Sequence, residues 1–329
     1  MSRLHVGVLR GGPSSEYDVS LASGAAVLEN LSEDKYDVTD ILISRDGKWH
    51  SRGLPIPPER ALQKLDVALI ALHGEYGEDG SVQKILNAYN IAYAGSGVLG
   101  STLAMNKGQA KTRVGTLDGV KMPGHVVLHL EDVQDSLQEA VQNVFSKFGP
   151  GYIVKPLRGG SSVGILVADS ISALPDVLAE AFESTDSVIV EQFIQGREGT
   201  CGIVENLRNE QLYSLPPVEI IAPKTEGFWD YESKYDDEHE LICPGNFTTA
   251  EKQIMQNAAR SVHNTLGLRH YSRSDFIVAP SGIYFLEVNT LPGLTPTSLL
   301  PKSLESIGMT FPDFLDHLVE LALMQHRVV

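Results

Sequence analysis

The sequence predicts an α/β protein that begins with a doubly wound parallel sheet. The first observation is a pair of short apolar runs, LHVGVL at residues 4–9 and DVALIAL at residues 66–72, of the kind found in buried parallel strands. The second is that a segment with helical spacing follows each run, SLASGAAVLENL and GSVQKILNAYN. Such sheets bind ligands at the carboxyl ends of their strands, which here carry the polar, glycine-rich segments RGGPSSE and HGEYGEDG.

The remaining elements divide the chain into three predicted domains, 1–97, 98–185 and 186–329. In the first domain, Ser15 and Asp18 resemble a capping box for the helix that follows. The second has predicted helices through LAMNKGQAKT, from about Glu131 to Lys147 and over residues 171–183, and predicted strands YIVKP and ILVAD. The third has strands SVIVEQF and EGTCGIV, a loop-like segment at 223–246, a helix over TTAEKQIMQNAARSVHNTL, a hairpin and two closing helices.

Composition limits the classes of function. The 329 residues are 42% hydrophobic and 21% charged, and no apolar run is long enough to cross a bilayer. The start, MSRLHVGVLRGG, has too short an apolar core for a signal peptide, so we expect a cytoplasmic protein. Two cysteines in different contexts indicate neither a disulfide framework nor a zinc site. A net charge of −16 argues against nucleic acid as a partner, but not against a small anion held by a few cations.

The hairpin RSDFIVA-PSG-IYFLEVN carries polar groups on one face. A three-residue loop, Pro280-Ser281-Gly282, would place Asp275 opposite Glu287 and Arg273 opposite Asn289. Because side chains alternate along a strand, all four would share a face, opposite an apolar face that includes Phe276, Val278, Tyr284, Leu286 and Val288. Three such oxygen ligands suit Mg²⁺. The alternative is a solvated sheet face with an Arg–Asp pair.

The segment RGGSSVG formally matches a G-x-S-x-G nucleophile elbow with Ser162 as nucleophile, which would indicate a hydrolase. That motif requires a helix directly after it, whereas ILVAD is strand-like. We therefore predict a glycine-rich hairpin loop whose backbone N–H groups cover phosphates. Neither a Walker A motif nor G-x-G-x-x-G occurs.

Two lysines and two carboxylates have positions that suit ATP. Lys155 ends an apolar strand directly before the glycine loop, where an ammonium needs an anion. Lys107 follows a helical turn, and backbone groups from Glu191 through Gln192 to Ile194 could contact an adenine edge. Glu198 could bind the ribose hydroxyls. Taken singly, each has an ordinary alternative, a lysine snorkelling to water or a surface carboxylate.

Together these residues resemble the ATP-grasp superfamily, and other segments resemble its D-alanine–D-alanine ligase family. The superfamily pattern is carried by Lys107, Lys155-Pro156, Gly160-Ser161-Ser162-Val163-Gly164, Glu191, Glu198, Arg273-x-Asp275 and Glu287-Val288-Asn289-Thr290. The ligase family is indicated by GGPSSEYDVSLASG, LHGEYGEDGSVQ, FWDYESKY and EVNTLPGLTPTSLLP, so the resemblance covers nearly the whole chain. It implies an ATP-grasp fold, ATP-dependent joining of two D-alanines, a homodimer formed through the N-terminal domain, and two Mg²⁺ ions for which Mn²⁺ can substitute.

The resemblance also implies roles for individual residues. The expected ATP contacts are Lys107, Lys155, Ser161, Ser162, Glu191, Gln192, Ile194, Glu198, Lys234 and Asn289, and the expected metal ligands are Asp275, Glu287 and Asn289. Glu16 and His73 would bind the first D-alanine, and Ser298 and Leu299 the carboxylate of the second. Arg273 and the N–H of Gly293 would stabilise the oxyanion, while Glu16, Ser161 and Tyr235 would fasten a lid that contains FWDYESKY over an acylphosphate intermediate.

The sequence differs at three places from the motifs that are common in the family, with MNK in place of MDK, EGT in place of ELT, and RHYSRSD where a run of small residues often precedes the arginine. Only Gly199, beside Glu198, bears on a proposed contact, the one to ribose. Tyr235 favours D-alanine over D-lactate as second substrate. Two other hypotheses remain, namely a related ATP-grasp ligase with another acceptor, such as D-serine or D-lactate, and an inactive nucleotide-binding protein. All charged groups that the chemistry requires are present, which speaks against the last.

Overall fold

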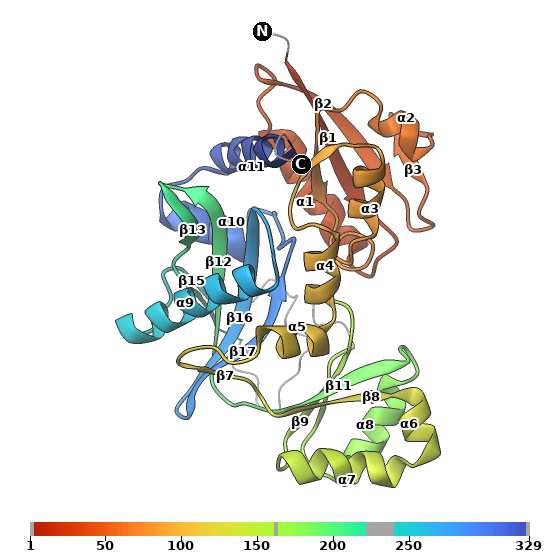
Figure 1. Cartoon of the computed structure of the whole chain (residues 1–329), viewed down its shortest axis with the longest axis vertical. Helices are drawn as coiled ribbons and strands as arrows, with labels where there is room; N and C mark the ends of the chain where they lie inside the picture. Colours follow the sequence, from red (N-terminus) through yellow and green to blue (C-terminus); the bar gives the residue numbers. More distant parts are fainter. Residues whose placement is uncertain (1–2, 161–163, 222–239, 327–329) are drawn as a thin grey trace.

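The computed structural model describes residues 3–160, 164–221 and 240–326. Its strands form three sheets arranged along the long axis of the molecule (Figure 1). The small sheet from the middle of the sequence, called central here, lies at the lower end in this view, and the C-terminal sheet lies between it and the N-terminal sheet. Helices α4 (Val98–Met105) and α5 (Lys107–Val114) connect the first part to the other two.

The N-terminal sheet confirms the predicted parallel core. Its order is β4-β3-β2-β1-β5-β6, and β1 is parallel to both β2 and β5. The strands are β1 (Leu4–Gly11), β2 (Tyr36–Ile43), β3 (Trp49–Ser51), β4 (Leu54–Pro55), β5 (Val67–Ala71) and β6 (Ala92–Ala94). Its helices are α1 (Tyr17–Asn30), α2 (Pro58–Leu62) and α3 (Ser81–Ala88), and the last helix of the chain, α11 (Phe311–His326), returns to pack beside β5 and β6.

The predicted capping box at Ser15 and Asp18 is wrong. Glu16 is the N-cap of α1, and no side chain caps the helix there. The neighbouring Ser14 hydroxyl instead accepts the N–H of Glu16 and donates to the carbonyl of His73. Local hydrogen bonds of serine compete with capping in this way, and here they tie the end of β1 to the end of β5.

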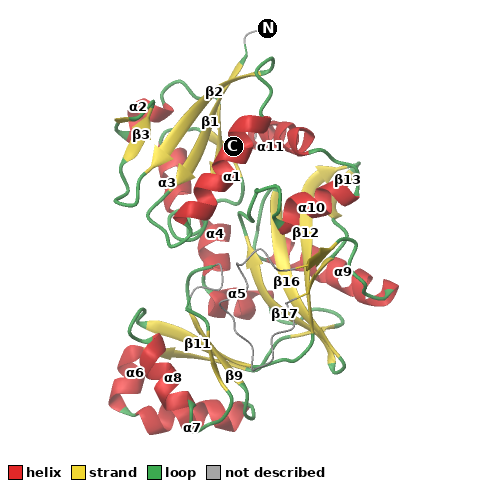
Figure 2. Cartoon of the chain, turned by 180° about the vertical axis from the view of Figure 1, so that it is seen from behind, coloured by secondary structure: helices red, strands yellow, loops and turns green. Residues whose placement is uncertain are grey.

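The central sheet has the order β10-β9-β11-β8 and is antiparallel throughout. Its strands are β8 (His125–His129), β9 (Tyr152–Pro156), β10 (Leu166–Ala168) and β11 (Ser187–Gln192). Helices α6 (Leu130–Asp135), α7 (Leu137–Lys147) and α8 (Leu174–Ala181) cover one face of it (Figure 2). The pairing of β9 with β10 confirms that a strand, not a helix, follows the glycine-rich loop, which rules out a nucleophile elbow at Ser162.

Two predicted helices are each split in two. The segment LAMNKGQAKT contains the end of α4 and the start of α5, because Asn106 leaves helical geometry (φ −91°, ψ 101°) and its side chain accepts the N–H of Gln109. Ser136 interrupts the predicted Glu131–Lys147 helix in the same way and accepts the N–H of Glu139. Both are N-cap residues, which favour the start of a new helix over continuation of the old one.

The C-terminal sheet has the order β15-β14-β12-β16-β17-β7, with β13 paired to β12. Its strands are β7 (Val120–Lys121), β12 (Arg197–Leu207), β13 (Glu210–Ser214), β14 (Val218–Ile221), β15 (Glu240–Ile242), β16 (Tyr271–Ala279) and β17 (Gly282–Asn289). Helix α9 (Thr249–Thr265), which carries a Thr248/Glu251 capping box, and α10 (Leu299–Ser306) complete this part. Strand β15 lies inside the segment predicted to be loop-like, of which residues 223–239 fall outside the described ranges.

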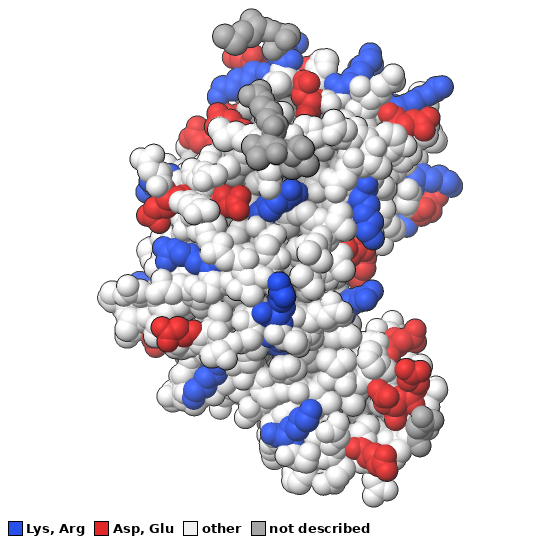
Figure 3. Space-filling model, viewed as in Figure 1, with Lys and Arg blue, Asp and Glu red and all other residues white. Residues whose placement is uncertain are grey.

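Two strands pair across the predicted domain limits, which stay predictions. Strand β11 starts just after residue 185 but pairs within the central sheet, and β7 lies before residue 185 but pairs with β17 of the C-terminal sheet. On the face shown in Figure 3, acidic and basic side chains are mixed over the upper part, and acidic side chains predominate at the lower right. Among the described residues, we find no helix with the length and hydrophobicity to span a bilayer.

Candidate active site

The hairpin of β16 and β17 brings the predicted polar residues together. Arg273 pairs with Asn289, and Asp275 pairs with Glu287, as predicted. The guanidinium of Arg273 donates from Nε to Oδ1 of Asp275 at 2.9 Å and from Nη2 to Oδ2 at 3.0 Å. The amide of Asn289 donates to Oδ2 of Asp275 at 3.0 Å. Arg273, Asp275 and Asn289 are therefore joined by hydrogen bonds into one polar surface, and Glu287 lies opposite Asp275 on the neighbouring strand.

The predicted turn of this hairpin is wrong. Ala279 pairs with Gly282, so the loop contains only Pro280 and Ser281, and Gly282 is the first residue of β17 with φ +133°. With that turn alone, every pair along the hairpin would be shifted by one residue, and the polar groups would not face each other.

A β-bulge restores the register at the site. Asp275 lies opposite Glu287 but Phe276 lies opposite Phe285, so Leu286 is an extra residue on β17. The predicted apolar face changes accordingly, since Ile283 and Phe285 replace Tyr284 and Leu286. The buried residues of this face are Phe276, Val278, Ile283, Phe285 and Val288.

The donor set of this surface fits Mg²⁺. Asp275 and Glu287 supply carboxylate oxygens and Asn289 a carboxamide oxygen, which are the hard ligands that Mg²⁺ takes alongside water and phosphate. The side chains of Asp275 and Glu287 are 12% and 26% exposed, so they stay accessible. The described ranges hold no group of three or more His, Cys, Asp or Glu side chains placed for a metal, and the predicted set of two carboxylates and one amide is of another kind.

Lys107 connects this surface to the glycine-rich loop. It is the first residue of α5, and its Nζ lies 3.5 Å from Oε2 of Glu287 and donates to the carbonyl of Gly159 at 2.6 Å. An ammonium between a carboxylate that is predicted to bind a metal and a glycine loop is well placed for a phosphate.

A second, buried cluster lies next to it. Glu191 at the end of β11 accepts a hydrogen bond from Nζ of Lys155 at 2.9 Å, and Nζ of Lys111 lies 2.9 Å from its other oxygen. The side chains of Lys111, Lys155 and Glu191 are 1%, 5% and 2% exposed. Burial raises the pKa of Glu191, but the two ammonium groups outweigh it and hold the pKa at about 2, so the carboxylate is charged.

The predicted adenine and ribose contacts lie along the segment that follows β11. The N–H groups of Gln192 and Phe193 already donate to backbone carbonyls, and the partly buried Ile194 comes next. Glu198 lies on β12, partly buried, with Gly199 beside it. A Cβ at Gly199 would lie 2.8 Å from the ring of Phe247, so this ring occupies the space that a side chain at residue 199 would need.

Glu16 joins the N-terminal domain to the glycine-rich loop. It is 8% exposed, and a Cβ at Gly160 would lie 2.8 Å from its Oε1, so only glycine lets the loop approach this carboxylate. The predicted partners of Glu16, Ser161 and Tyr235, lie outside the described residues, as do Ser162 and Lys234. Their placement stays a prediction.

His73 at the end of β5 is held from both sides. Its Nδ1 lies 2.9 Å from the carbonyl of Leu291, and its Nε2 lies 2.7 Å from the hydroxyl of Ser23. Glu78 lies beside it, with Oε1 3.9 Å from Nδ1. Burial raises the pKa of Glu78 to about 7 despite its contact with His73. Through its contact with Leu291, His73 fixes the end of β5 against the loop that follows β17.

That loop carries the remaining predicted residues. A Cβ at Gly293 would lie 2.9 Å from the hydroxyl of Ser298, so the chain folds back on itself there. Ser298 is the N-cap of α10, Leu299 is its first residue, and no side chain caps the helix. The N-terminus of a helix attracts anions, which suits a substrate carboxylate.

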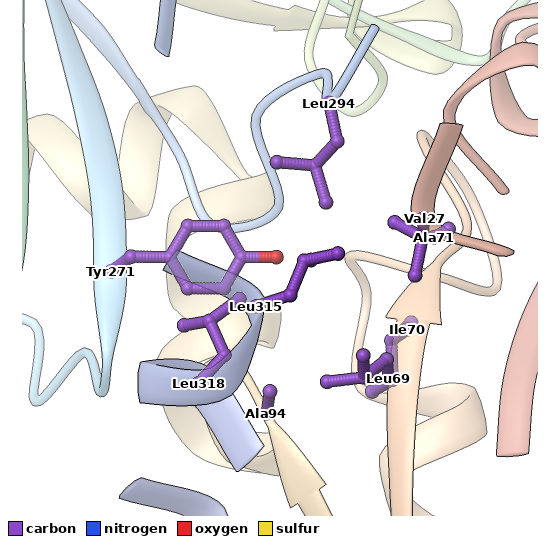
Figure 4. A pocket seen from close by; sticks show the side chains of 9 residues that line it. All are labelled: Val27, Leu69, Ile70, Ala71, Ala94, Tyr271, Leu294, Leu315 and Leu318. Atoms are coloured by element: carbon purple, nitrogen blue, oxygen red, sulfur yellow. The ribbon is translucent and has the colours of Figure 1, made fainter. Parts of the chain in front are cut away.

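A small apolar cavity of about 10 Å³ lies apart from these polar groups, between the N-terminal sheet and α11. Leu294 and Tyr271 help to line it, and the Tyr271 hydroxyl points into it (Figure 4). With space for about one water, it offers no room for a substrate.

Sequence reasoning missed three residues of the site. Lys111 was signalled only by its position four residues after Lys107, which puts both on one helix face. Thr200 was signalled by alternation from Glu198, and its hydroxyl donates to Oδ1 of Asp275 at 2.6 Å. Glu78 lies only five residues after its partner His73, but nothing in the local sequence indicated that its carboxyl would be buried there.

Known proteins resemble the chain over almost its full length. The family profile "D-ala D-ala ligase C-terminus" matches residues 116–320, and "D-ala D-ala ligase N-terminus" matches residues 5–55 and 50–96. The D-alanine–D-alanine ligase of Geobacter sulfurreducens is 39% identical over 95% of this chain and 92% of its own length. That of Desulfotalea psychrophila is 38% identical over 99% and 97%.

Solved structures give the same result. The VanG D-Ala:D-Ser ligase from Enterococcus faecalis superposes with a TM-score of 0.84 at 31% identity, covering 98% of this chain and 100% of that one. The D-alanyl-alanine synthetase A from Vibrio cholerae gives 0.83 at 30% identity, covering 98% and 99%.

Helix α5 carries Lys107 and Lys111 between the central and C-terminal sheets, and the solved ligases share this arrangement of sheets, which defines an ATP-grasp ligase. This confirms the predicted fold class. Within that class, the matches over both halves of the chain show that it belongs to the D-alanine–D-alanine ligase family.

Proposed function

We propose that this enzyme joins two D-alanine molecules to D-alanyl-D-alanine at the expense of ATP, for peptidoglycan precursor synthesis. The observation that carries the proposal is the contact between Lys107 and Glu287, 3.5 Å from Nζ to Oε2. It brings a phosphate-binding cation next to a metal-binding carboxylate. Family membership and the names of its relatives support the same activity.

In the first step, the carboxylate of one D-alanine attacks the γ-phosphorus of ATP, and ADP leaves. Glu16 binds the ammonium of this D-alanine and His73 lies beside it, so the substrate carboxylate points toward the phosphate. Lys107 and Lys155 orient the phosphates. Bound at Asp275, Glu287 and Asn289, Mg²⁺ would offset the charge on the transferred phosphoryl group.

In the second step, the amine of the second D-alanine attacks the acyl carbon, its extra proton is lost, and inorganic phosphate leaves. Arg273 and the N–H of Gly293 stabilise the oxyanion that develops. Ser298 and Leu299 at the start of α10 hold the carboxylate of the second substrate. The acylphosphate must be kept from water, so we propose that the segment 223–246, which contains FWDYESKY, is a lid that Tyr235 and Ser161 fasten to Glu16.

The second candidate is a ligase that accepts D-serine as second substrate. It is favoured by the structural likeness to a D-Ala:D-Ser ligase. The names of the relatives favour D-alanine. A D-lactate acceptor is disfavoured by Tyr235 in the proposed lid.

We also propose a homodimer formed through the N-terminal domain and a cytoplasmic location, where ATP is supplied. Sedimentation of the purified chain tests the first, and sedimentation at the monomer mass would exclude it.

The deciding experiment measures ATP-dependent phosphate release with Mg²⁺ and D-alanine, L-alanine, D-serine, or D-alanine plus D-lactate, with mass identification of the product. We expect release with D-alanine and the mass of D-alanyl-D-alanine. Release only when D-serine accompanies D-alanine would move the enzyme to the second candidate. ATP binding without turnover on any D-amino acid would overturn both.

A further inference from the structure

The proposed mechanism leaves Lys111 without a task, although it is one of the most deeply buried charges of the site. Its side chain is 1% exposed and its Nζ is held between Glu191 and the carbonyl of Leu286, so it is not placed to contact a substrate. It lies on α5, one turn after Lys107 and on the same face of the helix. A buried ammonium is costly unless its partners compensate for the loss of water.

The first partner of Lys111 is the bulge in β17. Its Nζ donates to the carbonyl of Leu286 at 2.7 Å and lies 3.5 Å from that of Phe285. Leu286 is the extra residue that restores the register between Asp275 and Glu287. Since a bulge residue lies outside the regular ladder, Lys111 supplies the donor that the neighbouring strand does not.

The second partner is Glu191, whose Oε1 lies 2.9 Å from the same Nζ. The groups that face Glu191 are Lys111 from α5, Lys155 from β9 and His125, its cross-strand neighbour on β8. His125 is occupied with the carbonyl of Pro123. The charge of Glu191 is therefore balanced by two lysines, one of which is the proposed phosphate ligand.

These contacts lead to an inference that rests on the proposed function. When Lys155 turns to the phosphates of ATP, Glu191 loses one of its two cations inside the protein. We infer that Lys111 is a positioning residue that keeps Glu191 ionised during this exchange and holds the bulge at Leu286, so that the nucleotide site and the metal site stay in register. A lysine with only a packing role would not affect the protonation of Glu191.

The test is a comparison of wild type with Lys111→Met, which keeps the length of the side chain and removes its charge. ATP binding is measured by calorimetry in buffers with different ionisation enthalpies, near neutral pH, with the wild type as reference for protons that ATP itself exchanges. In the variant, a buried carboxylate that loses its last cation takes up a proton. We expect extra uptake of up to about one proton per ATP and an affinity reduced about tenfold.

Lys147→Met, at an exposed lysine of α7, is the matched control and should behave as wild type. Proton uptake in Lys111→Met equal to that of wild type would overturn the inference. Failure of the wild type to bind ATP would instead overturn the proposed function.

A second variant covers the case in which Lys111→Met does not fold. Lys111→Gln keeps a donor for the carbonyl of Leu286 and removes the charge, so it should fold and still show the extra proton uptake on ATP binding. If Lys111→Gln takes up no more protons than wild type, Lys111 does not keep Glu191 ionised and the inference fails.

Discussion

Two cation–carboxylate clusters lie side by side in this enzyme, and they differ in exposure. The cluster around Glu191 is sealed, with side chains that are at most 5% exposed. The cluster around Asp275 is open, with Arg273, Asp275 and Glu287 exposed by 17%, 12% and 26%. The open cluster can exchange its partners for metal and substrate, whereas in the sealed one Lys111 and Glu191 fix charge and geometry and only Lys155 is proposed to turn to a ligand. Exposure, more than residue type, separates the two roles.

The largest effect is expected in the open cluster. Arg273→Ala should lower kcat for dipeptide formation by a factor on the order of 1,000 or more, because the oxyanion loses its guanidinium. ATP affinity, measured by nucleotide titration, should change less than about threefold, since other side chains hold the nucleotide. Arg113→Ala, an exposed arginine on α5, serves as control. A collapse of ATP affinity with residual ligation would show that this role of Arg273 is wrong.

In the sealed cluster the order of effects reverses. Lys155→Ala should weaken ATP binding on the order of 100-fold before it affects chemistry, because a cation that orients phosphate is removed. Lys111 stays in place, so Glu191 remains paired and the fold should persist. Nucleotide titration of the variant beside Lys147→Ala measures the effect. Wild-type affinity in Lys155→Ala would exclude this lysine from the phosphate site.

The sequence predicted the open cluster better than the sealed one, and the reason is physical. Asp275, Glu287, Arg273 and Asn289 lie in one hairpin, where alternation and pairing decide which side chains meet. Even there, the predicted pairing of Asp275 with Glu287 is correct only because two features that were not predicted offset each other, namely the shorter turn and the bulge at Leu286. The sealed cluster combines α5, β9, β11 and β17, which are distant in the sequence, so no local pattern could reveal it.

The same difference between local and distant contacts explains which parts of the fold could be predicted from the sequence. The parallel core and most strands were predicted, because apolar runs are local signals. The breaks at Asn106 and Ser136 were missed, since a single N-cap residue competes with an otherwise uninterrupted helical pattern. The return of α11 to the N-terminal sheet has no local signal at all.

A third carboxylate tests whether lysine partners decide the charge of a buried acid. Glu78 has His73 as its neighbour, and burial raises its pKa to about 7 from an ordinary 4.5. The folded state therefore binds a proton that the unfolded state has lost, and stability falls as pH rises through this window. Between about pH 5 and pH 7.5 the loss should be about 2 kcal/mol.

Denaturant titrations of wild type and Glu78→Gln at both ends of this range measure the effect. The variant should lose less stability than wild type, while Glu75→Gln, at an exposed neighbour, should follow wild type. Equal pH dependence in all three proteins would mean that Glu78 is ionised in the fold without a lysine.

The smallest effect concerns Thr200, a buried residue of β12 that contacts Asp275 of the open cluster from the neighbouring strand. Thr200 is 2% exposed and donates to Oδ1 of Asp275 at 2.6 Å, so it orients a proposed metal ligand without being placed to bind the metal itself. Thr200→Val keeps the shape but removes the donor, and should weaken Mn²⁺ binding, measured by titration with a non-hydrolysable ATP analogue present, about tenfold. Thr200→Ser restores the hydroxyl and should restore affinity. Unchanged affinity in Thr200→Val would mean that Arg273 and Asn289 suffice to orient Asp275, and that the open cluster needs no support from β12.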